Sequence, residues 1–127
     1  MKRIYPTCAQ VIEFHRRIIA ATGGSDGLRS AALLESALAR AHAGFDGHQL
    51  YPSIEEKAAA AGCGLIQNHP FLDGNKRIGI AVMLLILQSN GITPHYTQAE
   101  LIALGLDAAS GTMDIPQVTE WIRSHTA

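Results

Sequence analysis

The fold class is decided by residues 75–91, which read NKRIGIAVMLLILQSNG. Residues 78–87 are almost all apolar, and a helix that is apolar on nearly every face belongs inside a protein. The ten residues of this run are about half of what a membrane-spanning helix needs. Asn90-Gly91 supplies a helix stop. We therefore predict a central, buried helix over residues 75–89.

Four helices around it are predicted by capping boxes, in which Ser, Thr or Asp is followed three residues later by Glu or Gln. The four boxes are Thr7 with Gln10, Ser53 with Glu56, Thr97 with Glu100, and Asp114 with Gln117. The helix that begins at Thr7 is expected to end at Gly23-Gly24, and the helix that begins at Thr97 is expected to end at Gly111. A further helix, from Ser30 to about Ala43, has apolar residues at helical spacing. The sequence thus predicts an all-α fold, a compact six-helix bundle.

Two connecting segments have distinct signals. Gly44 to Pro52 contains the turn dipeptide Asp46-Gly47, which predicts a short hairpin or flap. Ile92 to Tyr96 is expected to be extended, because Pro94 disfavours helix at the residue before it. No segment alternates between apolar and polar residues for long enough to build a larger sheet.

Composition sets the broad class of protein. The 127 residues are 47% hydrophobic, which fits one domain over residues 1–127 with its own core. Ten basic and 11 acidic residues leave a net charge of −1, so direct nucleic-acid binding through phosphates is not expected. Polar residues interrupt the N-terminal region where a secretion signal would need an apolar run. We therefore expect a cytoplasmic protein with no membrane partner.

Chemistry is concentrated in residues 68–77, NHPFLDGNKR, just before the central helix. The first turn of a helix offers free N–H groups and the positive end of the helix dipole, and Gly74 lets the backbone approach a ligand closely. Lys76 and Arg77 add two cations where cations are unfavourable by ~0.3–1 kcal/mol each. A sequence that accepts this cost is expected to bind an anion there, and phosphate is the natural candidate.

Two further side chains extend this hypothesis. Asp73 is a hard oxygen ligand suited to a divalent metal that bridges phosphates. His69 supplies an imidazole, the side chain most often used as a general base, and could accept a proton from an attacking hydroxyl. Each residue alone also fits an ordinary role: a helix N-cap, a loop histidine or a solvated cation. Together they are typical of a phosphoryl-transfer site.

The string HPFLDGNKR resembles the core motif of the Fic/Doc family, H-x-F-x-[DE]-G-N-[GK]-R. Lysine after the asparagine is the form found in the death-on-curing (Doc) branch, the toxins of type II toxin–antitoxin modules. The resemblance extends over residues 28–91 most strongly, including Gly27-Leu28-Arg29, residues 33–40 and residues 56–59. It implies a compact helical bundle with the motif in the loop before the central helix.

The resemblance also implies roles for single residues. His69 would take the proton from a hydroxyl on a target protein, Asp73 would bind Mg²⁺, and Arg77 would contact phosphate. The anion-binding nest would be Gly74, Asn75 and Lys76. Lys76 and Arg77 are also expected to take part in catalysis. Phe71 would anchor the loop in the core.

Two positions favour one reaction over another. Lys76 stands where adenylylating Fic enzymes have Gly, and Ile80 stands where they have a second Arg. Doc-type proteins share both changes, and they transfer the terminal phosphate of ATP to elongation factor Tu, which stops translation. The sequence therefore favours a kinase-type transferase that uses ATP and Mg²⁺. The alternatives are transfer of AMP to a protein hydroxyl, and an inactive module that only binds a partner.

The resemblance raises three further expectations. Some Doc proteins carry an Arg at the position of Gln67, so Arg40 is a candidate for a replacement cation. Residues 44–51 would be the flap that docks the target protein. No inhibitory [ST]-x-x-x-E-[GN] string is present, so a separate antitoxin would restrain the protein by laying a helix in an apolar groove. Gly79 or the first helix is expected to line that groove.

Overall fold

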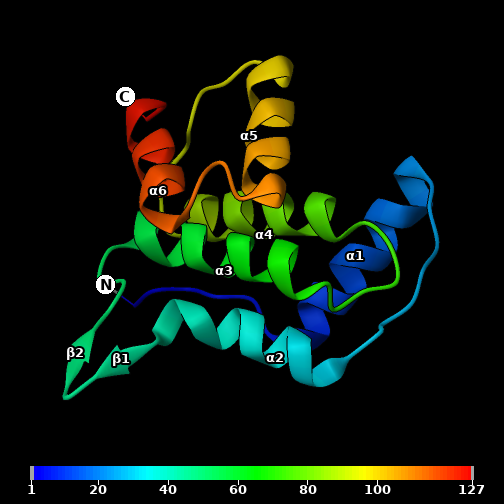
Figure 1. Ribbon diagram of the computed structural model, residues 1–127, viewed down its shortest axis with the longest axis horizontal. Coiled ribbons are helices and arrows are strands. Elements are labelled where there is room, and N and C mark those ends of the chain that lie inside the picture. Colours follow the sequence, from blue (N-terminus) through cyan, green and yellow to red (C-terminus); the bar gives the residue numbers. More distant parts are fainter. Residues whose placement is uncertain (1, 127) are drawn as a thin grey trace.

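The computed structural model describes residues 2–126, which form six α-helices, one 3₁₀ turn and a small hairpin (Figure 1). The helices are α1 (Cys8–Thr22), α2 (Ala31–Ala39), α3 (Ile54–Asn68), α4 (Asn75–Ser89), α5 (Gln98–Ser110) and α6 (Ile115–Ser124). The 3₁₀ turn η1 (Arg40–His42) follows α2, and the strands are β1 (Gly44–Phe45) and β2 (His48–Gln49). The predicted all-α bundle is confirmed.

Local capping fixes where the helices begin. All four predicted capping boxes form, at α1, α3, α5 and α6, with the two reciprocal hydrogen bonds of each box present. Ser30 caps α2 by accepting the N–H of Leu33. The helix expected from Ser30 to Ala43 ends as an α-helix at Ala39, and its last turn tightens into η1.

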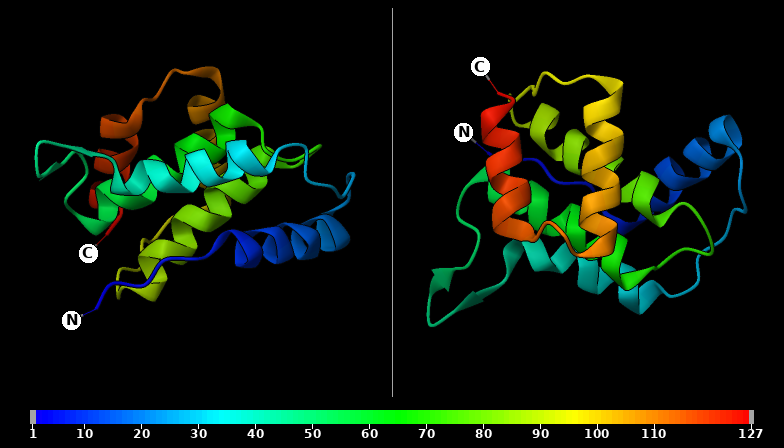
Figure 2. Two further views of the ribbon diagram at one scale, coloured as in Figure 1. Left: turned by 90° about the horizontal axis from the view of Figure 1, so that it is seen from below. Right: turned by 45° about the horizontal axis from the view of Figure 1, so that its top comes forward.

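The core is built on the packing of α3 against α4 (Figure 2). α2 and α6 also pack on α3, and α1 packs on α4. The expected central helix is confirmed, and the Ala- and Gly-rich α3 is even more enclosed, with every residue from Lys57 to Ile66 buried. Glycines allow this close contact: a Cβ on Gly79 would lie 2.8 Å from the carbonyl oxygen of Gly62. The chain reverses between the two helices at residues 69–74, which we call the motif loop.

The predicted hairpin is confirmed, and it extends away from the bundle (Figure 1). Gly44 pairs with Gln49 across it. Asp46 and Gly47 both have positive φ, at 53° and 78°, as two-residue hairpin turns require. The buried Lys57 ammonium holds its base, donating to the Gln49 side chain at 2.6 Å.

Neither cysteine is bonded to another: Cys63 is buried and Cys8 is half-buried. Burial raises the pKa of the Cys63 thiol to about 11, so this thiol packs as a small apolar group. Within residues 2–126, no helix has both the length and the apolar character to cross a membrane.

Candidate active site

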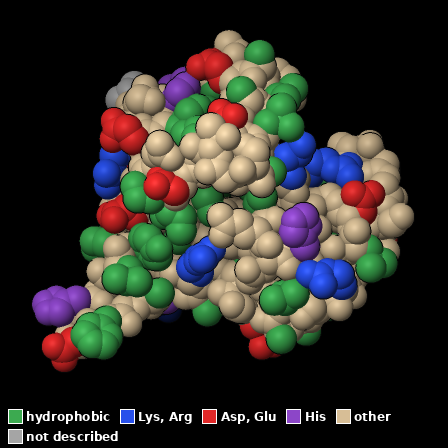
Figure 3. Space-filling model, viewed as in Figure 1, with side chains coloured by type: hydrophobic (Ala, Val, Ile, Leu, Met, Phe, Trp, Pro, Cys, Tyr) green, Lys and Arg blue, Asp and Glu red, His purple; other side chains and the backbone are tan. Residues whose placement is uncertain are grey.

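Seven consecutive or nearly consecutive residues surround a hollow of about 290 Å³ at the start of α4. They are His69, Leu72, Asp73, Gly74, Asn75, Lys76 and Arg77. This set includes all six residues that the sequence nominated for catalysis, metal binding and phosphate binding. Basic side chains and a histidine lie on this face over the adjoining ends of α3 and α4 (Figure 3). The structure therefore brings the nominated residues together.

Two left-handed residues shape the motif loop. His69, the residue that follows α3, has φ 50° and ψ 56°, and Gly74, the residue that precedes α4, has φ 75°. The left-handed region is strained for a non-glycine residue, by about 1–2 kcal/mol. Arg29 offsets this strain, since its guanidinium donates to the carbonyl oxygens of His69 at 2.7 Å and Asn68 at 2.9 Å. Arg29 belongs to the Gly27-Leu28-Arg29 stretch that resembles the Doc branch, but the sequence alone predicted no role for it.

The segment between α1 and α2, residues 23–30, holds the motif loop from outside. The Leu72 N–H donates to the Gly27 carbonyl at 3.0 Å, and the Arg29 N–H donates to the Pro70 carbonyl at 2.7 Å. These backbone hydrogen bonds fix the path of the loop against a segment more than 40 positions earlier in the chain. Their long sequence separation explains why no local pattern predicted them.

Asn75 faces the motif loop and the core, and only its backbone N–H is available to an anion. Its side-chain oxygen accepts the Phe71 N–H at 3.0 Å, and its Nδ2 donates to the Phe71 carbonyl at 3.0 Å. Phe71 itself is 2% exposed, so the predicted anchor is in place. Both backbone partners fix the orientation of the Asn75 amide. The same Nδ2 lies 3.2 Å from Nδ1 of His69.

This contact determines which nitrogen of His69 carries the proton. The amide nitrogen of Asn75 can only donate, so Nδ1 of His69 accepts and neutral His69 carries its proton on Nε2. In this arrangement Nε2 is a hydrogen-bond donor. To act as a base, the exposed His69 ring must turn away from Asn75, so that its unprotonated Nδ1 is free to accept the proton of the substrate hydroxyl.

Asp73 is half-exposed, and the groups around its carboxylate stabilise the ionised form. It accepts the backbone N–H of Ser25 at 3.2 Å and that of Gly74 at 2.8 Å, and the Arg77 guanidinium lies 3.8 Å away. These two hydrogen bonds, and then the nearby Arg77 charge, lower the Asp73 pKa from its ordinary value. No cluster of three metal-ligating side chains exists among residues 2–126. A divalent ion at Asp73 would thus rely on phosphate oxygens and water for its other ligands, as Mg²⁺ often does.

Arg77 and Lys76 occupy the edge of the hollow in different ways. Arg77 reaches back to the end of α1, where Nη1 donates to Thr22 Oγ1 at 2.6 Å and to the Gly23 carbonyl at 2.7 Å. Its Nη2 remains beside the hollow. Lys76 is exposed, and its stem passes close to Gly105 of α5. The N–H groups of residues 75–77 have no hydrogen-bond partner in the described chain, so they are free for an anion.

An apolar groove of about 400 Å³ adjoins the hollow, between α1, α4 and α5. Its apolar walls come mainly from Ile18, Ile80, Leu84, Leu101 and Ile102. Lys76 and Arg77 border both the groove and the hollow. Of the two candidates for lining such a groove, Gly79 or the first helix, α1 lines it and Gly79 does not. Gly79 is buried against Ile66 and Gly62 of α3, because its missing side chain serves helix packing.

Two other candidate positions lie outside the hollow. Arg40 donates to the Gln67 side chain at 3.0 Å, and neither residue lines the hollow.

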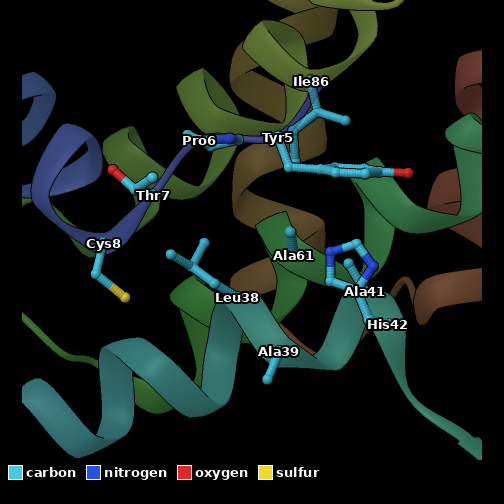
Figure 4. A pocket seen from close by; sticks show the side chains of 10 residues that line it. All are labelled: Tyr5, Pro6, Thr7, Cys8, Leu38, Ala39, Ala41, His42, Ala61 and Ile86. Atoms are coloured by element: carbon cyan, nitrogen blue, oxygen red, sulfur yellow. The ribbon is translucent and has the colours of Figure 1, made fainter. Parts of the chain in front are cut away.

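A separate cavity of about 240 Å³, near the far end of α4, has mainly apolar walls (Figure 4). The Tyr5 and His42 rings meet edge to face there, 4.6 Å apart. Burial raises the Cys8 pKa, so this thiol is not activated as a nucleophile.

Comparison with known proteins agrees with this geometry. The model of a family described as Fic/DOC matches residues 5–87, which include α1 to α3, the hairpin, the motif loop and most of α4. The chain is 40% identical over 72 residues to a protein named Toxin Doc from Mycolicibacterium smegmatis. This similarity covers 57% of the chain and 55% of that relative, or about half of each. The chain belongs to the Fic/Doc family.

Proposed function

We propose that this chain is a Doc-type toxin that transfers the terminal phosphate of ATP to a hydroxyl group of a translation-machinery protein in the cytoplasm. One observation carries the proposal. The hollow at the start of α4 combines free N–H groups, two cations, an ionised carboxylate and a histidine in one small space. A helix start of this kind favours a polyphosphate anion.

The proposed roles follow from the positions of the groups. The N–H groups of residues 75–77 and the Lys76 ammonium hold phosphate oxygens, and Arg77 adds charge through Nη2. Asp73 would hold Mg²⁺, which neutralises charge on the phosphates when bound. His69 orients the target hydroxyl and takes its proton after leaving Asn75. Catalysis would then come mainly from positioning and charge stabilisation.

Phosphoryl transfer is favoured over adenylyl transfer by what surrounds the phosphate site. Ile80, at the position of the second Arg of adenylylating enzymes, contributes an apolar wall to the groove. The Lys76 side chain borders the hollow itself, where it would crowd an inner phosphate. Both features support a site that presents the terminal phosphate. The printed name of the relative, Toxin Doc, supports the same class of protein.

The apolar groove supports a second element of the proposal, a cognate antitoxin. A groove with apolar walls between three helices fits an amphipathic helix. Lys76 and Arg77 at its border would attract acidic side chains on that helix. An antitoxin helix seated there would lie beside the phosphate site and obstruct it. The hairpin, with Phe45 81% exposed, offers a separate docking point for the target protein.

Label transfer from ATP tests the proposal. The protein is incubated with elongation factor Tu, Mg²⁺ and ATP labelled on either the γ- or the α-phosphate. We expect label on the factor only from γ-labelled ATP, and loss of transfer in His69→Ala and Asp73→Ala. His95→Ala, an exposed histidine far along the chain from the motif loop, is the matched control and should stay active. Equal activity in all variants would refute the proposal.

Three measurements separate the alternatives: the position of the transferred label, ATP binding without transfer, and growth on expression. Label from α-labelled ATP would identify AMP transfer by the same site. Binding of ATP without transfer to any protein of a cell lysate would identify an inactive binding module. Growth arrest on expression, relieved by His69→Ala, would support toxicity that depends on the site.

A further inference from the structure

We propose that His15 of α1 is a positioning residue for the phosphate site. It holds the peptide group between Asp73 and Gly74 so that the carbonyl faces the core and the N–H faces the carboxylate and the hollow. His15 lies 58 positions before Asp73 and outside the Fic/Doc motif. The inference deepens the proposed function, on which its activity measurement rests.

The hydrogen bonds of His15 define its state. Its side chain is 1% exposed, and Nε2 lies 2.7 Å from the carbonyl oxygen of Asp73. A carbonyl oxygen only accepts, so Nε2 carries the proton and donates. In the neutral ring Nδ1 is then bare, and it is the one buried side-chain polar atom without a hydrogen-bond partner in residues 2–126. The Asp26 carboxylate, 3.7 Å away, is too distant for a hydrogen bond.

An apolar residue would avoid the free-energy cost of this unpaired nitrogen. The imidazole offsets this cost only through its other nitrogen, which donates to the Asp73 carbonyl. The ring also stacks on Phe71, with centroids 3.8 Å apart and an interplanar angle of 9°. Both contacts of His15 are thus made with the motif loop. Val11 and Ile19, buried one turn before and after it, hold this part of α1 in the core.

The geometry of the peptide shows what His15 controls. In a trans peptide the C=O and N–H point in opposite directions. Because His15 draws the Asp73 carbonyl inward, the Gly74 N–H points outward and reaches the Asp73 carboxylate at 2.8 Å. Gly74, which has no Cβ, permits the peptide to flip. A flipped peptide would aim a carbonyl oxygen at the bound anion and remove one hydrogen bond from Asp73.

Two substitutions separate positioning from simple core filling. His15→Gln places an amide nitrogen near the position of Nε2 and keeps a donor for the Asp73 carbonyl. His15→Phe keeps the aromatic stack on Phe71 and loses the donor. If His15 only fills space, Phe is the better replacement, since it removes the unpaired Nδ1 and keeps the aromatic stack. If His15 positions the peptide, Gln is the better one.

The test uses the full chain and two kinds of measurement. Nitrogen-15 NMR of the wild type should show His15 protonated on Nε2 and bare at Nδ1, and the Gly74 amide signal should shift strongly in His15→Phe but little in His15→Gln. Under phosphotransfer conditions, the Mg·ATP concentration for half-maximal rate should rise about tenfold in His15→Phe and less than about threefold in His15→Gln.

Each outcome bears on a distinct claim. Proton on Nδ1 of His15, or His15→Phe matching the wild type while His15→Gln does not, overturns the positioning role. If His15→Phe fails to fold, the wild-type tautomer and the His15→Gln variant still decide. If the wild type transfers no phosphate to any target, the proposed function fails, while the NMR measurements on Gly74 still support or refute the role of His15.

Discussion

The substitution Gly79→Ala tests the close packing of α3 against α4, which sets the spacing of the motif loop's two ends. A methyl group at Gly79 would lie 2.6 Å from Cγ1 of Ile66 and 2.8 Å from the carbonyl oxygen of Gly62. The carbonyl belongs to a helix backbone and cannot rotate away. The two helices must therefore move apart by several tenths of an ångström.

The expected magnitude follows from two opposing effects. Overpacking of a core costs about 1–3 kcal/mol, whereas alanine in place of glycine in a helix gains up to about 1 kcal/mol. We therefore expect Gly79→Ala to lower the free energy of unfolding by about 1–2 kcal/mol. For a chain of this size, this is a fall of roughly 4–8 °C in melting temperature. Phosphotransfer should fall as well, because His69 and Asp73 lie at the ends of the separated helices.

Gly105→Ala is the matched control, since it is the same substitution inside another helix. A methyl group there would meet only the flexible stem of Lys76 at 3.4 Å and Ile80 at 3.6 Å, which are ordinary contact distances. This variant should be more stable than the wild type by up to about 1 kcal/mol. Thermal and urea unfolding followed by circular dichroism measure both variants. Equal or greater stability of Gly79→Ala would refute the packing argument.

Two further predictions concern single contacts. Arg29→Ala removes both hydrogen bonds that support the left-handed His69, so we expect the free energy of unfolding to fall by about 1–3 kcal/mol and phosphotransfer to weaken. Arg29→Lys should restore neither property, since an ammonium lacks the planar fork that reaches two carbonyls. Full activity of both variants would contradict the role of Arg29. The hydrogen bond to the Trp121 carbonyl, and then the one to Glu100, raise the pKa of His125 from its ordinary value of 6.5. Protonated His125 therefore stabilises the fold fully below pH 6.5, and this stabilisation is lost as the pH rises through the raised pKa. The melting-temperature difference between wild type and His125→Gln should shrink from pH 6 to pH 8, and a constant difference would contradict the assignment.

Local sequence signals predicted the helices well because helix ends are set by local chemistry. The capping boxes at Thr7, Ser53, Thr97 and Asp114 each satisfy backbone donors within three residues, so the sequence alone contains the whole interaction. The two-residue turn of the hairpin is equally local. The motif loop was located for the same reason, since Gly74 marks the beginning of α4.

The orientation of side chains within the site was not predictable in this way. Arg77 turns toward the end of α1, because the fold brings Gly23 near from 54 positions earlier in the chain. Asn75 turns toward Phe71 and His69, only four and six positions away, but the path of the motif loop that places them there depends on hydrogen bonds to Gly27 and Arg29. Of Gly79 and the first helix, the two candidates for lining the groove, only the helix does so, because close helix packing places Gly79 on the opposite face of α4. His15 gave no local signal, since its partner on the motif loop is 58 positions away.

A crystal structure of the protein with Mg²⁺ and a non-hydrolysable ATP analogue tests the central claim most directly. We expect phosphate oxygens on the N–H groups of residues 75–77, Mg²⁺ on the Asp73 carboxylate, and the terminal phosphate nearest to His69. Nucleotide bound away from the start of α4, or an α-phosphate in the place expected for the terminal one, would contradict the proposed phosphotransfer.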